Sequence, residues 1–385
     1  MGESTGWKGR GALLVAHCAG MVDLVALPVW VGSLIAWYGL DPLRGGALPT
    51  FFLASVVVSS LFFAPRFNRI SGKVAAPAGF AIAALAFFGI YAGADDYVMM
   101  AGLHALAGVA VGCSLTFTHG TIGRSYRPHR IFAFAGMALS IFAIVFLGSM
   151  PKLLSVHGGP MLFAVLAGIM AVASIVTMLT FPLPERTTED ATAGFSRLDP
   201  AVWAVIVGIS CMSLIQAMMF SFLERIGSDR GFGLEAVAGV LFTIGIVNLL
   251  PAPLAAWLER RLPARRVVLA GPVTQAAIVL VISQSLTFVP YAIAASIFAA
   301  VIIFTHTYAF GLLSRLDSSG RAAAATPAMM MMGAAIGPVL GGALVKAFGY
   351  SSLGYAAVVI AVLSFFCFSR VPQAAVKLEA LASSA

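Results

Sequence analysis

Charged residues are scarce in this chain of 385 residues. Asp, Glu, Lys and Arg together make up 10% of it, against about 25% in an ordinary soluble domain. Hydrophobic residues make up 60%, which excludes a soluble fold and predicts an integral membrane protein. The net charge of +8 comes from basic residues spread over short polar segments. Because they form no patch or stripe, we expect no nucleic-acid partner.

Cysteine is also rare, and so are long polar segments. Cys18, Cys113, Cys211 and Cys367 all lie in apolar runs without paired spacing, which argues against a disulfide framework or a zinc site. We expect no metal and no cofactor. No polar segment is long enough for a soluble catalytic domain, so we expect no enzyme activity.

The sequence consists largely of apolar runs separated by short polar breaks. They must be helices, because hydrocarbon offers the backbone no hydrogen-bond partner and the alternation of a barrel strand is absent. The fold class is therefore an all-α integral membrane protein with twelve transmembrane helices. The runs lie near residues 11–38, 47–65, 74–93, 97–123, 131–150, 160–182, 200–223, 236–257, 267–286, 289–313, 322–345 and 351–369.

The distribution of the 23 basic residues predicts the orientation. Lys and Arg are retained in cytoplasmic loops, and most of them fall on the side that holds both termini. We therefore place both termini in the cytoplasm and the protein in the inner (cytoplasmic) cell membrane. The other side holds only Arg44, Lys152, Arg225, Arg230 and Lys346.

The two halves match each other at a nearly constant offset, which indicates an internal repeat. Cys18 and Asp23 correspond to Cys211 and Gln216. The segment after the second run likewise corresponds to the segment after the eighth. We expect an N-terminal six-helix bundle (1–182), a cytoplasmic linker (183–199), a C-terminal six-helix bundle (200–370) and a cytoplasmic tail (371–385).

The repeated segment carries a recognisable signature of a small residue followed by polar and basic residues. The whole pattern resembles the major facilitator superfamily of secondary transporters, in its twelve-helix form. Asn68 stands where that family usually has Asp. The resemblance implies that Asn68, Arg69, Glu259 and Arg260 take part in conformational gating. The two copies are Ala64, Asn68, Arg69 and Lys73, and Ala255, Glu259, Arg260, Arg265 and Arg266.

The eleventh run contains the segment GAAIGPVLGG, which includes Gly337 and Pro338. It looks like the antiporter motif of this superfamily, although that motif typically lies on the fifth helix. Small residues at every fourth position allow helices to approach closely, and proline removes one backbone hydrogen bond. We expect Gly337 and Pro338 to contribute to gating, with tight packing as the alternative.

Asp23 lies near the middle of the first run, close to the expected bilayer midplane. An ionisable group there costs roughly 2.5–3.5 kcal/mol on insertion scales, which makes it a functional candidate. We expect it to be protonated in one half of a transport cycle and ionised in the other. The alternative is a buried carboxyl group that bonds a neighbouring helix.

Three histidines are further proton-coupling candidates: His17, His119 and His306. All are expected in the cytoplasmic half of the membrane, where a cluster is conceivable. On a straight helix His17 would point about 120° away from Asp23. Each histidine is equally compatible with a neutral packing role.

Aromatic side chains and one amide are the candidates for binding a substrate. Aromatic residues in apolar helices more often serve packing, and that alternative stays open. Lys and Arg are absent deep in the runs, which argues against substrates that are multiply charged anions. The candidates are Trp30, Gln216, Phe117, Phe220, Phe304 and Tyr308.

The resemblance implies a secondary active transporter that works by alternating access. We expect proton-coupled movement of a small organic compound, with export of a drug or metabolite by antiport ahead of uptake. One alternative is an uptake permease for an aromatic or other organic acid. Another is a copper importer that uses His17, Met21 and Met329–Met332. The expected partners are the small-molecule substrate, protons and the lipid bilayer, and the protein is expected to be a monomer.

Overall fold

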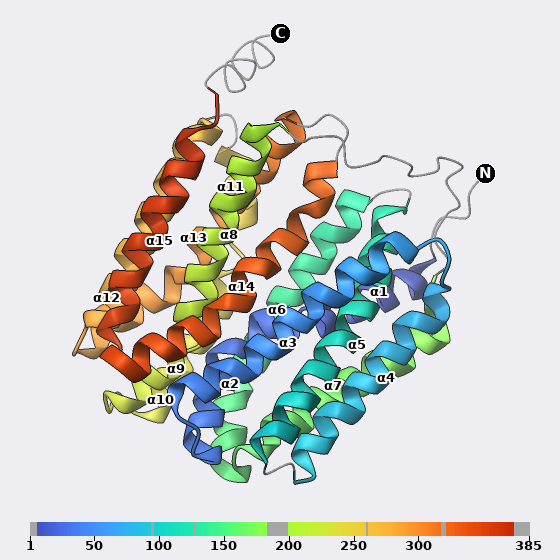
Figure 1. The fold of residues 1–385 in the computed structure, drawn as a ribbon, viewed down its shortest axis with the longest axis horizontal. Coiled ribbons are helices and arrows are strands. Elements are labelled where there is room, and N and C mark those ends of the chain that lie inside the picture. Colours follow the sequence, from blue (N-terminus) through green and yellow to red (C-terminus); the bar gives the residue numbers. More distant parts are fainter. Residues whose placement is uncertain are drawn as a thin grey trace. The chain divides into compact units, whose positions relative to one another are not determined.

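Helices account for all regular secondary structure in the described residues of the computed structural model (Figure 1). Those residues are 6–93, 96–125, 128–182, 199–258, 261–316 and 321–372. The chain divides into two units, Met1–Thr192 and Ala193–Ala385. The predicted linker and tail lie almost entirely outside the described residues.

Unit 1 contains the first six membrane spans. In this unit α3 packs on α5, α5 packs on α4, and α4 packs on α7, as Figure 1 shows. Trp30, Phe52, Phe87 and Phe163 are fully buried there. The elements are α1 (Trp7–Gly20), α2 (Val22–Tyr38), α3 (Pro42–Phe63), the short 3₁₀ helix η1 (Ala64–Arg66), α4 (Gly72–Tyr91), α5 (Tyr97–Gly123), α6 (Pro128–His157) and α7 (Pro160–Thr180).

Unit 2 contains the remaining six spans. Its central helix, α8, packs on α14 and α15, while α12 packs on α13 and α15. Two spans are interrupted, since α9 follows α8 and α11 follows α10 within single apolar segments. The helices are α8 (Pro200–Phe220), α9 (Leu223–Asp229), α10 (Leu234–Val247), α11 (Pro251–Leu258), α12 (Ala264–Gln284), α13 (Phe288–Leu316), α14 (Arg321–Phe348) and α15 (Ser351–Ser369).

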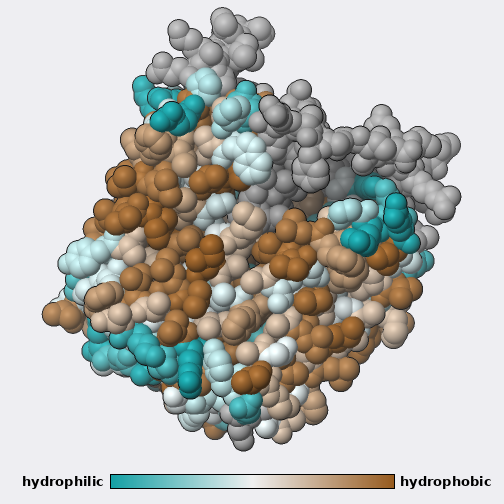
Figure 2. Space-filling view, viewed as in Figure 1, coloured by the Kyte–Doolittle hydropathy of each residue, from teal (hydrophilic) through white to brown (hydrophobic). Residues whose placement is uncertain are grey.

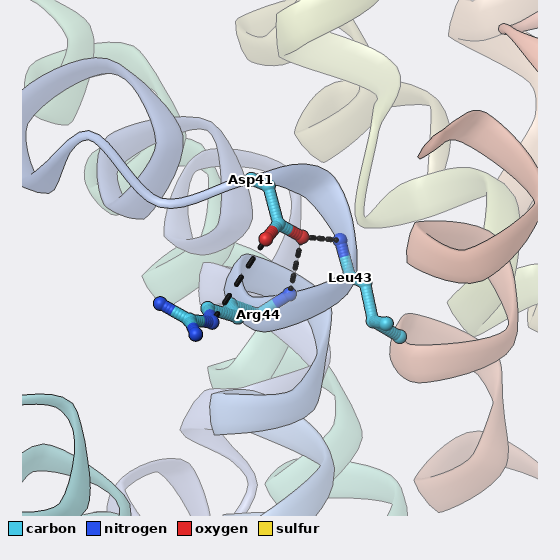
Figure 3. A network of polar contacts seen from close by, with 3 residues as sticks. All are labelled: Asp41, Leu43 and Arg44. Carbon is cyan, nitrogen blue, oxygen red and sulfur yellow. Dashed lines mark hydrogen bonds and ion pairs between the residues drawn. The ribbon is translucent and has the colours of Figure 1, made fainter. Parts of the chain in front are cut away.

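The turn between α2 and α3 illustrates how the sequence ends one span and starts the next. Gly39 adopts a left-handed conformation (φ 62°), which ends α2. The side chain of Asp41 then accepts hydrogen bonds from the backbone N–H groups of Leu43 (2.9 Å) and Arg44 (3.1 Å), as Figure 3 shows. Pro42 occupies the first turn, where no backbone donor is needed.

The outer surface of the helices suits a hydrocarbon environment. Figure 2 shows hydrophobic residues over the sides of the helices and hydrophilic residues near helix ends. Leu85, Leu179 and Val359 are each about seven-tenths exposed. Such exposure of large apolar side chains is typical of lipid-facing surfaces, because lipid tails are as apolar as leucine.

The expected fold class is confirmed: twelve helices among the described residues are long and apolar enough to cross a membrane. The boundaries differ in two informative places. The first span, Trp7–Tyr38, is broken at Met21, and the seventh extends to Asp229 instead of ending at residue 223. The side of the membrane on which the termini lie stays a prediction.

Candidate functional site

The first span breaks immediately before Asp23. Met21 leaves the helical conformation (φ −108°, ψ 22°), and its N–H donates to the carbonyl oxygen of His17 at 3.0 Å. A new helix, α2, starts at Val22, so Asp23 occupies its first turn. The first N–H groups of a helix have no partner within it, and the helix dipole favours an anion at that end.

Asp23 is buried and forms no ion pair with any of the residues that the structure describes. It is 3% exposed, and its Oδ1 has no hydrogen-bond partner among the described residues. A buried polar atom without a partner is rare in folded proteins and calls for an explanation. The break also means that helical angles counted from His17 to Asp23 on one straight helix do not apply.

Packing against α5 holds the end of α1 in place. A Cβ added to Gly20 would lie 2.6 Å from Cδ1 of Leu115 on α5. The glycine therefore permits a close approach of the two helices just before the break. Seven residues into α2, Pro28 lacks the N–H that would bond the carbonyl of Leu24.

The structure brings together two of the predicted histidines. Nδ1 of His17 lies 2.9 Å from Nε2 of His119, and the ring centroids are 5.1 Å apart. The pair joins α1 to α5, and the rings of His119 and Phe132, which lies on α6, pack in an edge-to-face arrangement. His306 lies in unit 2, where its Nδ1 bonds the carbonyl of Ile302 on its own helix at 2.9 Å and its ring packs on Phe310.

Trp30, a substrate-binding candidate, lies inside an aromatic cluster of unit 1. Its side chain is fully buried, and its indole N–H donates to Nε2 of His104 at 3.3 Å. Phe52 and Phe87 pack around it with ring centroids 5.4 and 5.8 Å away. These contacts give Trp30 a packing role. Sequence reasoning had no signal for its bond to His104.

The four other aromatic candidates also pack on protein neighbours. Phe117 is fully buried and stacks on Phe67, with centroids 5.5 Å apart. In unit 2, Phe304 and Tyr308 lie 5.2 Å apart, and the Tyr308 hydroxyl donates to the carbonyl of Ala255. The ring of Phe220 lies 6.1 Å from that of Phe298. Their role in substrate binding stays a prediction.

Gln216 has a partner that the sequence did not reveal. Gln275 on α12 is fully buried, and its Nε2 donates to the carbonyl of Met212 (3.1 Å) and to Oε1 of Gln216 (3.4 Å). Oε1 of Gln275 has no hydrogen-bond partner among the described residues. Gln216 is half-buried, and with its oxygen engaged its amide N–H₂ is the group left to bond a ligand.

The gating candidates after the second span form a polar contact with a neighbouring helix. Nη1 of Arg124, just beyond α5, donates to Oδ1 of Asn68 at 2.5 Å, and the guanidinium lies over the ring of Phe67. The acceptor in this contact is a neutral amide, at the position where the resemblance led us to expect Asp. Arg69 is exposed. Glu259 and Arg260 lie outside the described residues.

Gly337 belongs to a glycine face on α14 that packs directly on α8. A Cβ on Gly333 would lie 2.0 Å from the carbonyl oxygen of Ser210, and one on Gly337 would lie 2.6 Å from Cβ of Ala217. Pro338 is buried beside it. The hydroxyl of Ser213 donates to the carbonyl of Met330 at 2.7 Å, which ties the same two helices. Close packing therefore explains the glycines, whatever else the motif does.

The extended end of the seventh span carries a polar network that sequence analysis missed. Arg225 and Asp229 form an ion pair at 2.7 Å, and the hydroxyl of Tyr350 donates to the other oxygen of Asp229. Ser228 donates to Glu224. The relevant signal was the spacing of four between Glu224 and Ser228 and between Arg225 and Asp229, which places each pair on one face of a continuing helix.

Comparisons with known proteins agree on the fold. The model of the Major Facilitator Superfamily matches residues 12–271. An inward-facing, unoccupied bacterial homologue of the human lysosomal transporter Spinster superposes with a TM-score of 0.74 at 14% identity, covering 98% of this chain and 99% of that one. The nucleoside transporter NupG superposes with a TM-score of 0.71 at 15% identity, covering 94% and 98%.

No protein with a curated description matches the chain. The family match nevertheless covers more than half of it, and the described helices have the family's fold. The expected absence of enzyme activity agrees with this assignment, because members of the family are transporters. The chain is a multi-pass membrane protein that belongs to the Major Facilitator Superfamily of secondary transporters.

Proposed function

We propose that this transporter couples the movement of a small organic compound to protons through Asp23. The observation that carries the proposal is the environment of its carboxyl group, which is 3% exposed and has an oxygen without a hydrogen-bond partner. Ionisable residues inside membrane spans are rare and commonly mark ion and substrate pathways.

Both protonation states of Asp23 can form a favourable interaction at the break in the helix. As a carboxylate it lies in the first turn of α2, where the helix dipole favours an anion. As an acid it carries an O–H that can donate to a substrate. Broken helices with half-helix N-termini directed at ligands are a recurring way to build transport sites.

Export across the inner membrane, by antiport with protons, is the direction we put ahead of uptake. The glycine and proline motif on α14 supports it through its likeness to the antiporter motif. The absence of Lys and Arg from the middle of the described spans favours a neutral, weakly anionic, zwitterionic or cationic compound. The half-buried amide of Gln216 is the polar contact that we propose for it.

The experiment starts from a thermal-shift screen of organic compounds at two pH values, since a ligand stabilises the fold by mass action. The purified protein is then reconstituted in liposomes, and flux of a stabilising compound is measured with the pH gradient imposed in each direction. We expect Asp23→Asn to abolish the response to the gradient while exchange without a gradient persists. Gradient-driven flux in that variant at the wild-type rate contradicts the proposal.

Ser33→Ala is the matched control. Ser33 lies on the same helix, is 3% exposed, and its hydroxyl also has no partner among the described residues. The substitution removes a buried polar group without removing an ionisable one, so it should leave the response to the gradient intact. Infrared spectroscopy without any substrate gives a second test. In the wild type, the C=O band of the protonated Asp23 carboxyl group should appear as the pH is lowered and disappear as it is raised. This band should be missing in Asp23→Asn.

A further inference from the structure

The hydrogen bond between His17 and His119 links two rings that the sequence places on separate helices. The two nitrogen atoms are 2.9 Å apart. His17 is 8% exposed and His119 is half-buried. Since two nitrogen lone pairs repel each other at this distance, a proton must lie between them, and one ring donates it while the other accepts.

We propose that His17 and His119 form one proton-binding site that holds a single proton for the two rings. In the neutral pair, the donor ring has a bare nitrogen on its far side. A proton that binds there converts that ring to an imidazolium, and the N–H···N bond is kept. The positive charge then makes the bond between the rings stronger.

A second proton cannot be added in the same way. The only remaining basic nitrogen is the one that accepts the bond between the rings. Protonating it replaces the hydrogen bond by two N–H groups that face each other, and it places two cations with their centroids 5.1 Å apart. Interacting groups of this kind titrate as a pair and not as separate residues.

Few other ionisable groups face the pair. Just beyond α5, Arg124 is bonded to Asn68, and on α6 the guanidinium of Arg130 lies over Phe134 of its own helix. Cys18 adjoins His17 on α1. The span Pro160–Thr180, which contains α7, has no ionisable side chain. The nearest carboxyl group along the chain is Asp23 on α2.

The pair lies on the same broken span as Asp23. His17 and Asp23 are six positions apart in the chain, on either side of the break at Met21. A proton leaving Asp23 toward the Trp7 end of the span therefore has a second group to bind on the way. This role rests on the proposed proton coupling, whereas the count of one proton for two rings does not.

Proton uptake by the purified wild-type protein and by the double variant H17Q/H119Q tests the count. It is followed with a pH-indicator dye from about pH 8 to about pH 4, which brackets the ordinary histidine pKa of about 6.5. We expect the double variant to take up one proton fewer than the wild type. A deficit of two protons means independent histidines, and no deficit means a permanently neutral packing pair. Either result overturns the proposal.

The control is H17Q/H306Q, which combines His17 with a histidine that bonds a backbone carbonyl of its own helix. Its deficit should equal the sum of the deficits of the two single variants. Nitrogen-15 NMR of the labelled wild type gives a readout that needs no variant to fold. A scalar coupling between Nδ1 of His17 and Nε2 of His119 should persist after the pair has bound its proton, and loss of the coupling at that point contradicts a shared proton.

Asp23→Asn separates this proposal from proton coupling by Asp23. In this variant the pair of His17 and His119 should still bind one proton, and the scalar coupling between the two rings should persist. If it also retains gradient-driven flux, the role of Asp23 fails while the histidine pair stands. If the count fails in the wild type, the pair fails while Asp23 is unaffected.

Discussion

The indole N–H of Trp30 and the imidazole of His104 are joined by a buried hydrogen bond of 3.3 Å. Nδ1 of the same imidazole lies 2.7 Å from the carbonyl oxygen of Met100 and must therefore donate to it. Both ring nitrogens are thus engaged in the neutral form, with the proton on Nδ1. His104 differs in this respect from the histidine pair, whose bond to each other is the one hydrogen bond of either ring among the described residues.

Replacing His104 by Leu should destabilise unit 1 by about 1–3 kcal/mol, because the Trp30 N–H is left buried without a partner. The double variant Trp30→Phe with His104→Leu should lose less stability than the sum of the losses of the two single variants. Chemical unfolding in detergent measures both. Trp203→Phe, at a residue that is 51% exposed, should have little effect. Strictly additive losses would show that the hydrogen bond contributes nothing.

Gly333→Ala should destabilise unit 2 by about 1–3 kcal/mol, because the new methyl group overlaps the carbonyl oxygen of Ser210 on α8. Gly239→Ala on α10 is the control, since nothing lies within 4 Å of its added Cβ. That substitution should be neutral or slightly stabilising. The midpoint of thermal unfolding compares the two. Equal midpoints contradict close packing of α14 on α8.

Asn68→Asp should preserve transport, because a carboxylate at this position accepts the same bond from Arg124 and adds an opposite charge. Asn68→Leu removes the acceptor and should slow transport. The contact is exposed, so neither change should shift the free energy of unfolding by more than about 1 kcal/mol. Initial flux rates in liposomes, with unfolding measured in parallel, distinguish gating from stability. Wild-type flux in Asn68→Leu contradicts a gating role for this contact.

Gln275→Leu should have a small effect on stability, since it removes two hydrogen bonds together with the unpartnered oxygen of Gln275. It releases the amide of Gln216, however, so the affinity for a transported compound should fall severalfold. Binding of a compound identified by thermal shift measures this. Gln275→Met keeps the length of the side chain but donates no hydrogen bond, and it should weaken binding as well. Unchanged affinity in both variants means that Gln275 does not position Gln216.

Alkaline pH should weaken unit 2 through Tyr350, which lies between α14 and α15. Burial, followed by its hydrogen bond and charge interaction with Asp229, raises the pKa of Tyr350. A raised pKa means that this stabilisation is fully present below the unfolded value of about 10 and is lost as the pH rises above it. Thermal unfolding between about pH 8 and pH 11 measures the loss. Tyr350→Phe should be less stable than the wild type at pH 8, and its unfolding temperature should fall less between pH 8 and pH 11. If the unfolding temperature falls equally steeply in both proteins, Tyr350 is not the cause.

The sequence by itself determined the number of spans and singled out Asp23. Hydropathy is a property of each segment alone, so twelve long apolar runs predict twelve membrane helices whatever their packing. A carboxyl group inside such a run is visible for the same reason. The repeat and the basic segments after the second and eighth spans similarly pointed to the family, because they depend on spacing along the chain.

Only the tertiary structure decided which side chains meet. His17 and His119 are 102 positions apart, and Gln216 and Gln275 are 59 apart. Helical periodicity gives the faces of each helix, but it does not say which face meets which neighbour, since apolar residues occur on all sides of these helices. The exact position of the break, at Met21, was also decided there. Gly20 packs there against Leu115 of another helix. A contact between residues so far apart in the chain cannot be inferred from the local sequence.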